Sequence, residues 1–399
     1  MGIIFLRPTH VKDSLNKGFK VMKTKQWIWQ HHKYPHFNYD LKKLESLLLL
    51  ISRKQGELAA LSKVIGRDNF KKSQLSALEH EVMSSCAIES EHLDRESVKS
   101  SIKEKLGIET AQHYKQKSKE SNYVGILMDA SNNYKDGLTL KKILFWHDKM
   151  FENHNHRLWD ITVGDFRKKG TMQVISGVIG KEKVFYEAPA SETLEEEMKN
   201  YINWFNSTPA SLIKASIAHL WFVIIHPFDD GNGRITRAIT DMVLSEIESS
   251  NISRLYFMSK NINSDKKGYY KALEQTTGYI QKNNQMDITV WCEWFLNTLY
   301  KSLIEAISSI EYVVDKAKFW DKYKDSVLNS RQIKVLNTLL DKGALAFEGG
   351  LTTKKYIKIS KTTPATASRD INGLVLLGCI KQVEGTKGRN VRYDLILNS

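Results

Sequence analysis

The stretch His226-Pro227-Phe228-Asp229-Asp230-Gly231-Asn232-Gly233-Arg234-Ile235-Thr236-Arg237 combines a histidine, carboxylates, glycines and two arginines within twelve residues. The preceding residues, Leu212 to Ile225, are apolar almost all round, which predicts a buried helix. After the stretch, apolar residues recur at three- and four-residue steps, at Ile235, Ala238, Ile239, Met242 and Val243. This spacing predicts a second helix that starts near Gly233, so the stretch is expected to connect two helices.

The start of this second helix is a predicted anion site. The first N–H groups of a helix have no partner within it and carry positive partial charge. Gly231 and Gly233 allow the main chain to approach a ligand closely. Arg234 and Arg237 lie three residues apart, so both guanidinium groups could reach one polyphosphate. Asp230 suits a magnesium ion that bridges phosphates, because Mg²⁺ prefers one or two carboxylates and keeps several waters.

His226 is a candidate general base, because an unperturbed histidine has a pKa near ~6.5 and accepts a proton from a hydroxyl at neutral pH. Two other motifs of similar composition do not fit. An EF-hand loop would need alternating acidic positions and a closing Glu, and a P-loop would need a Gly-Lys-Ser/Thr ending. A Gly-Asn-Gly turn taken alone is often only a turn.

The complete string resembles the Fic-domain signature, His-x-Phe-x-Asp/Glu-Gly-Asn-Gly-Arg-x-x-Arg, at every signature position. The resemblance implies a mainly α-helical bundle with a small β-hairpin flap. It also implies a protein adenylyltransferase that moves AMP from magnesium-bound ATP to a Ser, Thr or Tyr hydroxyl of a target protein and releases pyrophosphate. In this family His226 would be the base and Asp230 the magnesium ligand. The phosphate site would comprise Gly231, Asn232, Gly233, Arg234 for the inner phosphates and Arg237 for the terminal one.

A second stretch, Ser84-Ser85-Cys86-Ala87-Ile88-Glu89-Ser90, lies in a segment rich in helix formers. Ser85 and Glu89 match the inhibitory motif of Fic proteins, Ser/Thr-x-x-x-Glu followed by Gly or Asn, and Ser90 departs from its final position. A glutamate against Arg237 would occupy the guanidinium that the terminal phosphate of a nucleotide needs. We therefore expect autoinhibition by a helix from the N-terminal part of the same chain. The alternative is a solvated helix glutamate.

A change of periodicity between Gly164 and Pro189 predicts a β-hairpin, with short strands on either side of Gly177 and Gly180. The resemblance implies that this hairpin is a flap that docks the target by strand addition. The candidate docking residues are Met172, Val174, Ile175, Val184, Phe185 and Tyr186. The segment Tyr269 to Leu273 resembles the lining of the adenine pocket, so Tyr270 and Leu273 are candidate base contacts, with Asn261 or Asn263 as candidate partners of the base or ribose.

The C-terminal segment resembles a winged helix-turn-helix domain. Helices are expected at 331–341, 351–357 and 363–377, and strands at 380–383 and 391–393. The charge of the whole chain is +14, and residues 328–399 hold twelve basic and five acidic residues, an excess of +7. This charge suits double-stranded DNA, whereas a protein-binding or dimerising domain is the alternative. The candidate DNA contacts are Thr366, Ser368, Arg369, Lys387 and Arg389.

The expected organisation of the 399 residues is an extension at 1–24, a helical module at 25–106, a catalytic domain at 107–312 and the winged helix-turn-helix domain at 313–399. Aromatic residues between Trp27 and Tyr39 are expected to anchor the N-terminus to a core. No apolar run approaches the ~18 residues that cross a membrane, and three cysteines without pairing or ligand spacing favour the cytoplasm. A homodimer stays open, and so do a nucleotide-sensing DNA-binding regulator and a Fic enzyme that uses another nucleotide or removes AMP.

Overall fold

The computed structural model describes residues 27–108, 118–152, 161–168, 172–176, 183–278, 286–342 and 350–397. The chain divides into two compact units, residues 1–307 and 308–399. The division falls within helix α11 (Thr289–Lys322), and so does the boundary expected after residue 312. The extension expected at residues 1–24 lies outside the described residues.

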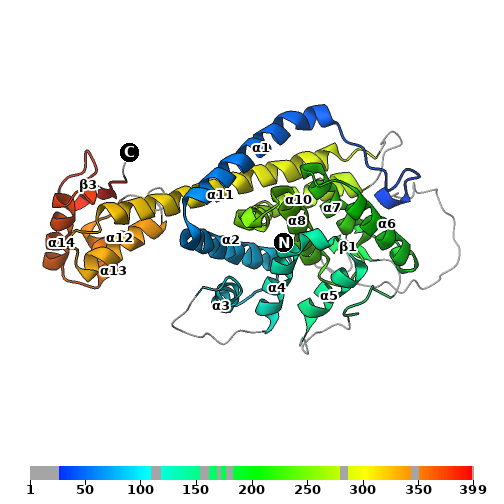
Figure 1. The fold of residues 1–399 in the computed structure, drawn as a ribbon, viewed down its shortest axis with the longest axis horizontal. Coiled ribbons are helices and arrows are strands. Elements are labelled where there is room, and N and C mark those ends of the chain that lie inside the picture. Colours follow the sequence, from blue (N-terminus) through cyan, green and yellow to red (C-terminus); the bar gives the residue numbers. More distant parts are fainter. Residues whose placement is uncertain are drawn as a thin grey trace. The chain divides into compact units, whose positions relative to one another are not determined.

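The first unit is mainly helical, as the sequence predicts (Figure 1). Its helices are α1 (Leu41–Val64), α2 (Arg67–Ile88), α3 (Arg95–Lys105), α4 (Ser118–Asn132), α5 (Leu140–Phe151), α6 (Leu194–Ser207), α7 (Leu212–Ile225), α8 (Asn232–Glu248), α9 (Met258–Ser264), α10 (Lys266–Thr277) and the start of α11. Helices α2, α4 and α7 all contact α8. No helix in these described ranges is long and apolar enough to cross a membrane.

Helices α7 and α8 pair in the core and hold the signature stretch between them. Ser211 caps α7 because its side chain accepts a hydrogen bond from the Lys214 N–H. Almost every residue of α7 is buried, which explains its lack of a polar face. Gly231 precedes α8 with φ +84°, a backbone conformation that favours glycine.

The aromatic segment before α1 packs on the first unit, as expected. The rings of Tyr34 and Phe37 lie edge-on to Trp221 of α7. The Trp221 indole N–H donates to the Tyr34 hydroxyl at 2.8 Å. The ring of Trp27 lies edge-on to that of Tyr186, and the Trp29 indole donates to the Glu187 carbonyl at 2.7 Å. The segment therefore joins α7 to the end of the hairpin.

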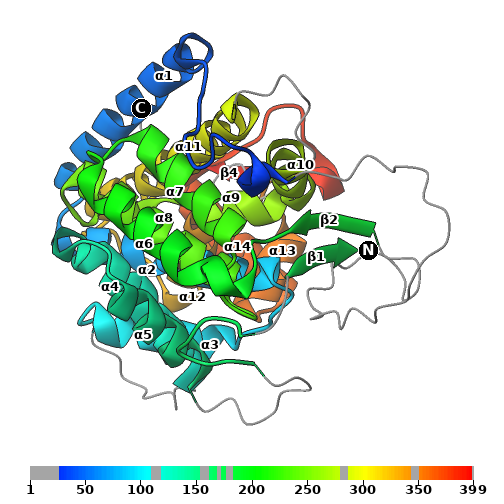
Figure 2. The same ribbon diagram turned by 90° about the vertical axis from the view of Figure 1, so that its right-hand side faces the viewer.

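The hairpin predicted between Met172 and Tyr186 is present. Strands β1 (Gln173–Ser176) and β2 (Lys183–Glu187) pair antiparallel, with Val174 opposite Tyr186 and Ile175 opposite Val184 (Figure 2). The register shifts between Val174 and Ile175. Residues 177–182, which include the two glycines that motivated the prediction, lie outside the described residues.

The second unit contains the end of α11, α12 (Ser330–Lys342), α13 (Thr353–Ser360) and α14 (Pro364–Leu376), followed by β3 (Ile380–Gln382) paired with β4 (Tyr393–Leu395). Asp370 of α14 joins the helices. Its carboxylate accepts from Arg331 Nε at 2.8 Å, from Asn329 at 2.9 Å and from the Tyr356 hydroxyl at 3.0 Å. These contacts tie α14 to α12 and α13.

Two boundaries in this unit differ from the prediction. Leu351 is not helical, because its N–H and carbonyl exchange hydrogen bonds of 2.7 and 2.9 Å with Tyr393. The last strand begins at Tyr393 rather than Val391, because residues Gly388–Asn390 form a 3-10 turn. The predicted start of α14 is confirmed, since the Thr363 side chain caps it and Pro364 occupies the first turn.

Candidate active site

His226 ends α7 in a left-handed backbone conformation, with φ 49° and ψ 59°. Its Nδ1 lies 3.3 Å from the Val223 carbonyl, which can only accept a hydrogen bond. Nδ1 therefore carries the proton, and Nε2 is the basic nitrogen. The side chain is 8% exposed, and burial together with the positive charge of Arg167 lowers the pKa of His226 to about 4. The imidazole is neutral at physiological pH, as a general base requires.

The loop after His226 is braced by its own side chains. Asn232 accepts from the Phe228 N–H at 3.0 Å and donates to the Phe228 carbonyl at 2.7 Å. The Phe228 ring is fully buried and stacks on the His147 ring of α5, with the ring centroids 4.0 Å apart, so it packs below the loop. His147 accepts from the Gly164 N–H, and its Nε2 lies 3.1 Å from the Asp230 carbonyl. His147 thus supports the loop.

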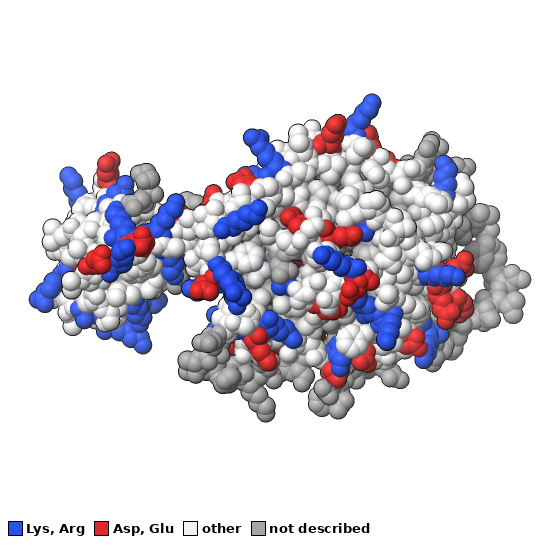
Figure 3. Space-filling view, in the orientation of Figure 1, with Lys and Arg blue, Asp and Glu red and all other residues white. Residues whose placement is uncertain are grey.

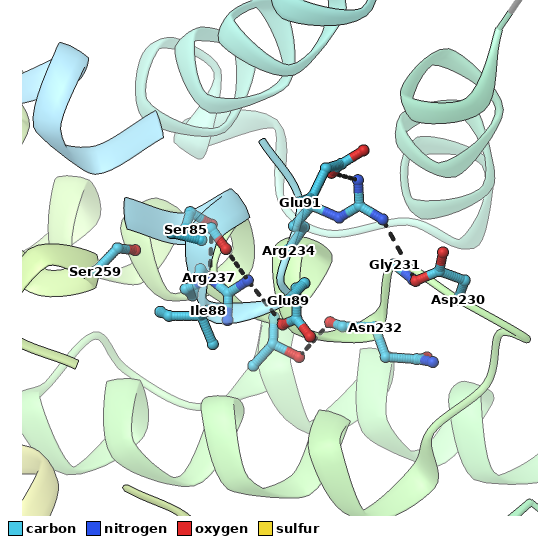
Figure 4. A network of polar contacts seen from close by, with 12 residues as sticks. Ser85, Ile88, Glu89, Glu91, Asp230, Gly231, Asn232, Arg234, Arg237 and Ser259 are labelled. Atoms are coloured by element: carbon cyan, nitrogen blue, oxygen red, sulfur yellow. Dashed lines mark hydrogen bonds and ion pairs between the residues drawn. The ribbon is translucent and has the colours of Figure 1, made fainter. Parts of the chain in front are cut away.

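The two signature arginines are buried at the start of α8 (Figure 4). Arg237 Nε donates to Ser85 Oγ at 2.7 Å, and Nη2 donates to the Ser85 carbonyl at 3.0 Å and to Glu89 Oε1 at 2.9 Å. Arg234 donates to Glu91 Oε2 at 2.5 Å and to Asp230 Oδ1 at 3.4 Å. Arg237 Nη1 and Arg234 Nε have no hydrogen-bond partner among the described residues. These buried donors are available to a ligand, and an anion such as a phosphate suits them.

Glu89 lies directly over the first turn of α8. A Cβ atom at Gly233 would be 2.0 Å from Glu89 Oε1, so only a glycine at 233 allows this approach. The carboxylate therefore occupies the helix N-terminus at which the sequence predicts a phosphate. The motif pairs Ser85 and Glu89 with Arg237, and the structure brings these three residues together.

Glu91 is a site residue that the sequence did not reveal. It pairs with Arg234 and also with Lys119 at the start of α4. Between the two glutamates, Ser90 adopts φ 59°, the left-handed region in which glycine and asparagine are less strained than other residues. This geometry accounts for the Gly or Asn that the inhibitory motif has at this position. Residues 89–91, here called the strap, thus hold both arginines.

The candidate base contacts lie on α10. Tyr270 is half-buried, and burial together with the charge of Glu89 raises the pKa of its phenol, so this residue lies within electrostatic reach of the strap. Leu273 is half-buried one turn further along α10. The Asn261 amide donates to the Phe257 carbonyl at 2.9 Å and to Glu305 at 3.1 Å. Neighbours within the chain therefore engage this amide.

The flap residues fall into two groups. Met172 and Tyr186 are buried, and the Tyr186 hydroxyl donates to the Ile224 carbonyl of α7 at 2.6 Å. These two side chains attach the hairpin to the core. Val174, Val184 and Phe185 are half-buried and stay candidates for docking. The structure does not describe the side chain of Ile175.

Asp230 is half-exposed, with a side chain 42% accessible, and its Oδ1 accepts from the Gly231 N–H at 2.6 Å. The described residues contain no group of three His, Cys, Asp or Glu that could hold a metal ion by themselves. One carboxylate beside a phosphate site fits Mg²⁺, which takes its remaining ligands from phosphates and water. The donor set suits magnesium bound together with a nucleotide.

The candidate DNA contacts belong to the second unit. Ser368 and Arg369 are exposed on α14, Thr366 is half-buried and Lys387 is exposed before β4. The structure does not describe the side chain of Arg389. Basic side chains are more prominent than acidic ones over α12 to α14 on the face drawn in Figure 3.

The comparisons with known proteins agree with the signature. Residues 137–244 match the Fic/DOC family, and residues 27–108 match a domain of unknown function, DUF4172. The chain thus carries a Fic/DOC domain. It is 33% identical over 116 residues to "Protein adenylyltransferase Fic" of Aedes aegypti, which is 28% of this chain and 20% of that protein. It is 32% identical over 101 residues to "Protein adenylyltransferase fic-1" of Caenorhabditis briggsae, which is 24% of this chain and 18% of that protein.

The chain therefore spans about a fifth of the length of these curated relatives. A Fic family protein from Desulfovibrio desulfuricans G20 has a similar solved structure. Its TM-score is 0.48 and its sequence identity 19%, over 88% of this chain and 97% of that one.

Proposed function

We propose that this protein is an adenylyltransferase that transfers AMP from ATP to a Ser, Thr or Tyr hydroxyl of a target protein. The observation that carries the proposal is the buried anion site of Arg234 and Arg237 at the start of α8, in the same loop as a neutral histidine with a basic Nε2. The Fic/DOC match and the relatives named protein adenylyltransferase support AMP as the transferred group.

In this reaction His226 Nε2 takes the proton from the target hydroxyl, whose oxygen attacks the α-phosphorus. Pyrophosphate leaves as the new phosphoester bond forms. The α8 N-terminus, shaped by Gly231, Asn232 and Gly233, and the two arginines hold the phosphates. Mg²⁺ held by Asp230 would neutralise phosphate charge. Tyr270 and Leu273 receive the base, and Val174, Ile175, Val184 and Phe185 pair with or contact the target segment.

The resting site is autoinhibited. Glu89 lies at the α8 N-terminus and forms an ion pair with Arg237, and Glu91 forms an ion pair with Arg234. A polyphosphate needs the same donors, so the strap and a productively bound nucleotide compete. Movement of residues 89–91 away from α8 frees both guanidinium groups.

The test is to incubate the Glu89→Gly variant with α-labelled ATP and Mg²⁺. Labelled protein is expected, and the label should disappear when His226→Ala is added. Label from γ-labelled ATP instead would mean that a phosphoryl group is transferred. Binding of ATP without label from any of several nucleotides would support the sensor alternative. Equal labelling by Glu89→Gly and the unaltered chain would remove the autoinhibition proposal.

A second candidate function belongs to the C-terminal unit. The helix pair α13 and α14 with the β3–β4 hairpin has the element order of a winged helix-turn-helix domain, and α14 exposes Ser368 and Arg369. We propose that this unit binds double-stranded DNA, with Lys387 on phosphates. Affinity for a duplex should fall steeply with salt, and Lys387→Ala should reduce that slope. No duplex binding at low salt would favour a protein partner.

A further inference from the structure

Arg167 connects three points around the catalytic loop. Its Nε donates to the His226 carbonyl at 2.9 Å, and its Nη2 donates to the Pro189 carbonyl. Its main-chain N–H donates to the Pro227 carbonyl at 3.0 Å. The side chain is only 2% exposed. One buried residue thus holds the first two carbonyls of the loop and the chain that follows the flap.

The backbone at His226 needs such a partner. A residue with a Cβ is strained at φ 49°, so the conformation persists only where its surroundings fix it. The His226 N–H is bonded to Phe222 at the end of α7, at 3.0 Å. On its other side, the carbonyl has left the helix and is bonded by Arg167. The guanidinium therefore fixes the peptide that determines the direction of the imidazole.

The flap is held through the same side chain. Pro189 follows Ala188, whose N–H donates to the Met172 carbonyl at 2.8 Å and closes the base of the hairpin. The bond from Arg167 to Pro189 joins this closed base to the loop that carries His226. The fork of an arginine can bond two carbonyls at once, whereas the single ammonium of a lysine cannot reproduce that spacing.

Titratable groups lie near both Arg167 and His226. Asp229, Tyr186 and Glu192 lie within electrostatic reach of Arg167, and burial lowers its pKa to about 10, so it stays cationic at neutral pH. Arg167 and Asp230 are the charged groups that face His226, with opposite effects on its pKa. Burial and the charge of Arg167 together outweigh Asp230, so the pKa of His226 is lowered and the imidazole is neutral.

We propose that Arg167 is a positioning residue, which holds His226 in its left-handed conformation and keeps the catalytic loop in register with the flap. This inference rests on the proposed transferase function. Arg167 contacts neither nucleotide nor target, and it acts on the distance between the base and the hydroxyl that the flap presents. A displacement of about 1 Å at a reacting group can reduce a rate on the order of 100-fold.

The test compares Arg167→Met and Arg167→Lys in the Glu89→Gly background. Arg254→Met is the matched control, because Arg254 is also buried and bonds to Ser131 and Asn132 at the end of α4. Thermal unfolding selects the variants that stay folded. The measurements are ATP affinity by calorimetry and the rate of labelling from α-labelled ATP between pH 4 and 9.

Arg167→Met should bind ATP within about twofold of its parent and label on the order of 100-fold more slowly. Without the positive charge the pKa of His226 rises, so the acid limb of the pH–rate profile should move to higher pH. Arg167→Lys keeps the charge but loses the fork, so it should be slow with an unmoved acid limb. The control should match its parent in rate and profile.

The inference is overturned if folded Arg167→Met labels at the rate of its parent with the same acid limb, or if Arg254→Met shows the same loss and shift. Loss of ATP affinity in Arg167→Met in proportion to its rate would assign the residue to binding. If Glu89→Gly itself labels nothing, the proposed function fails instead. If Arg167→Met does not fold, Arg167→Lys decides, and a normal rate in that variant overturns the role of the fork.

Discussion

Glu91→Gln should raise the affinity for ATP by freeing Arg234. The carboxylate is 2.5 Å from Arg234 Nη1, and the side chains of Glu91 and Arg234 are 19% and 4% exposed, so the bond is charge-assisted and mostly shielded from water. A hydrogen bond of this kind contributes about 1.5 to 3 kcal/mol. If the phosphates must replace it, its removal should lower the dissociation constant about 10- to 150-fold.

The assay is calorimetric titration with a non-hydrolysable ATP analogue at fixed Mg²⁺. Glu89→Gln should give a gain of similar size, because its bond to Arg237 is also a shielded ion pair. The double variant should gain less than the product of the two, since both glutamates belong to one strap and a released strap frees both arginines. Glu293→Gln, at an exposed position of α11, is the control.

An unchanged dissociation constant in folded Glu91→Gln would refute the reasoning. It would mean that the nucleotide binds without taking Arg234 from Glu91. A gain that persists when Arg234→Ala is added would refute it equally, because the effect would then not pass through that guanidinium.

Three further outcomes are expected. Ser90→Gly removes the strain of φ 59° and should strengthen the strap, so ATP affinity should fall about two- to fivefold, and a rise would contradict this. Burial lowers the folded-state pKa to about 4 for His226 and about 3 for His219, against 6.5 in the unfolded chain, so the unfolded chain binds more protons in this range. The urea midpoint should therefore fall as the pH is lowered from about 6.5 to 4, and it should fall less steeply in His226→Asn. Asp370→Ala should destabilise the second unit by on the order of 3 kcal/mol in denaturant unfolding, because it breaks the contacts that join its helices.

The sequence predicted those elements whose conformation depends on residues close to them in the chain. The periodicity on both sides of the signature stretch located α7 and α8, and a cap with a proline located the start of α14. Leu351 was misassigned to a helix because its conformation depends on Tyr393, 42 residues further along the chain.

Contacts of the candidate site were predicted only where a motif specifies their residues. The contact of Glu89 with Arg237 was predicted because the inhibitory motif implies it, and Ser90 was noted because it departs from that motif. Glu91 and Arg167 lie at positions that neither motif specifies, and their partners are 143 and 59 residues away in sequence. One arginine among 59 basic residues carries no local signal of a bond to a carbonyl in a distant loop.

The order of the strap and the arginines along the chain bears on how the protein is made. Glu89 precedes Arg237 by 148 residues, and Glu91 precedes Arg234 by 143. Domains fold as they emerge during synthesis, N-terminal parts first. Helix α2 and the strap therefore leave the ribosome before α8 exists. Under the proposed autoinhibition, Glu89 and Glu91 are in place to pair with the two arginines as soon as α8 folds, so a newly synthesised chain would begin with its nucleotide site closed.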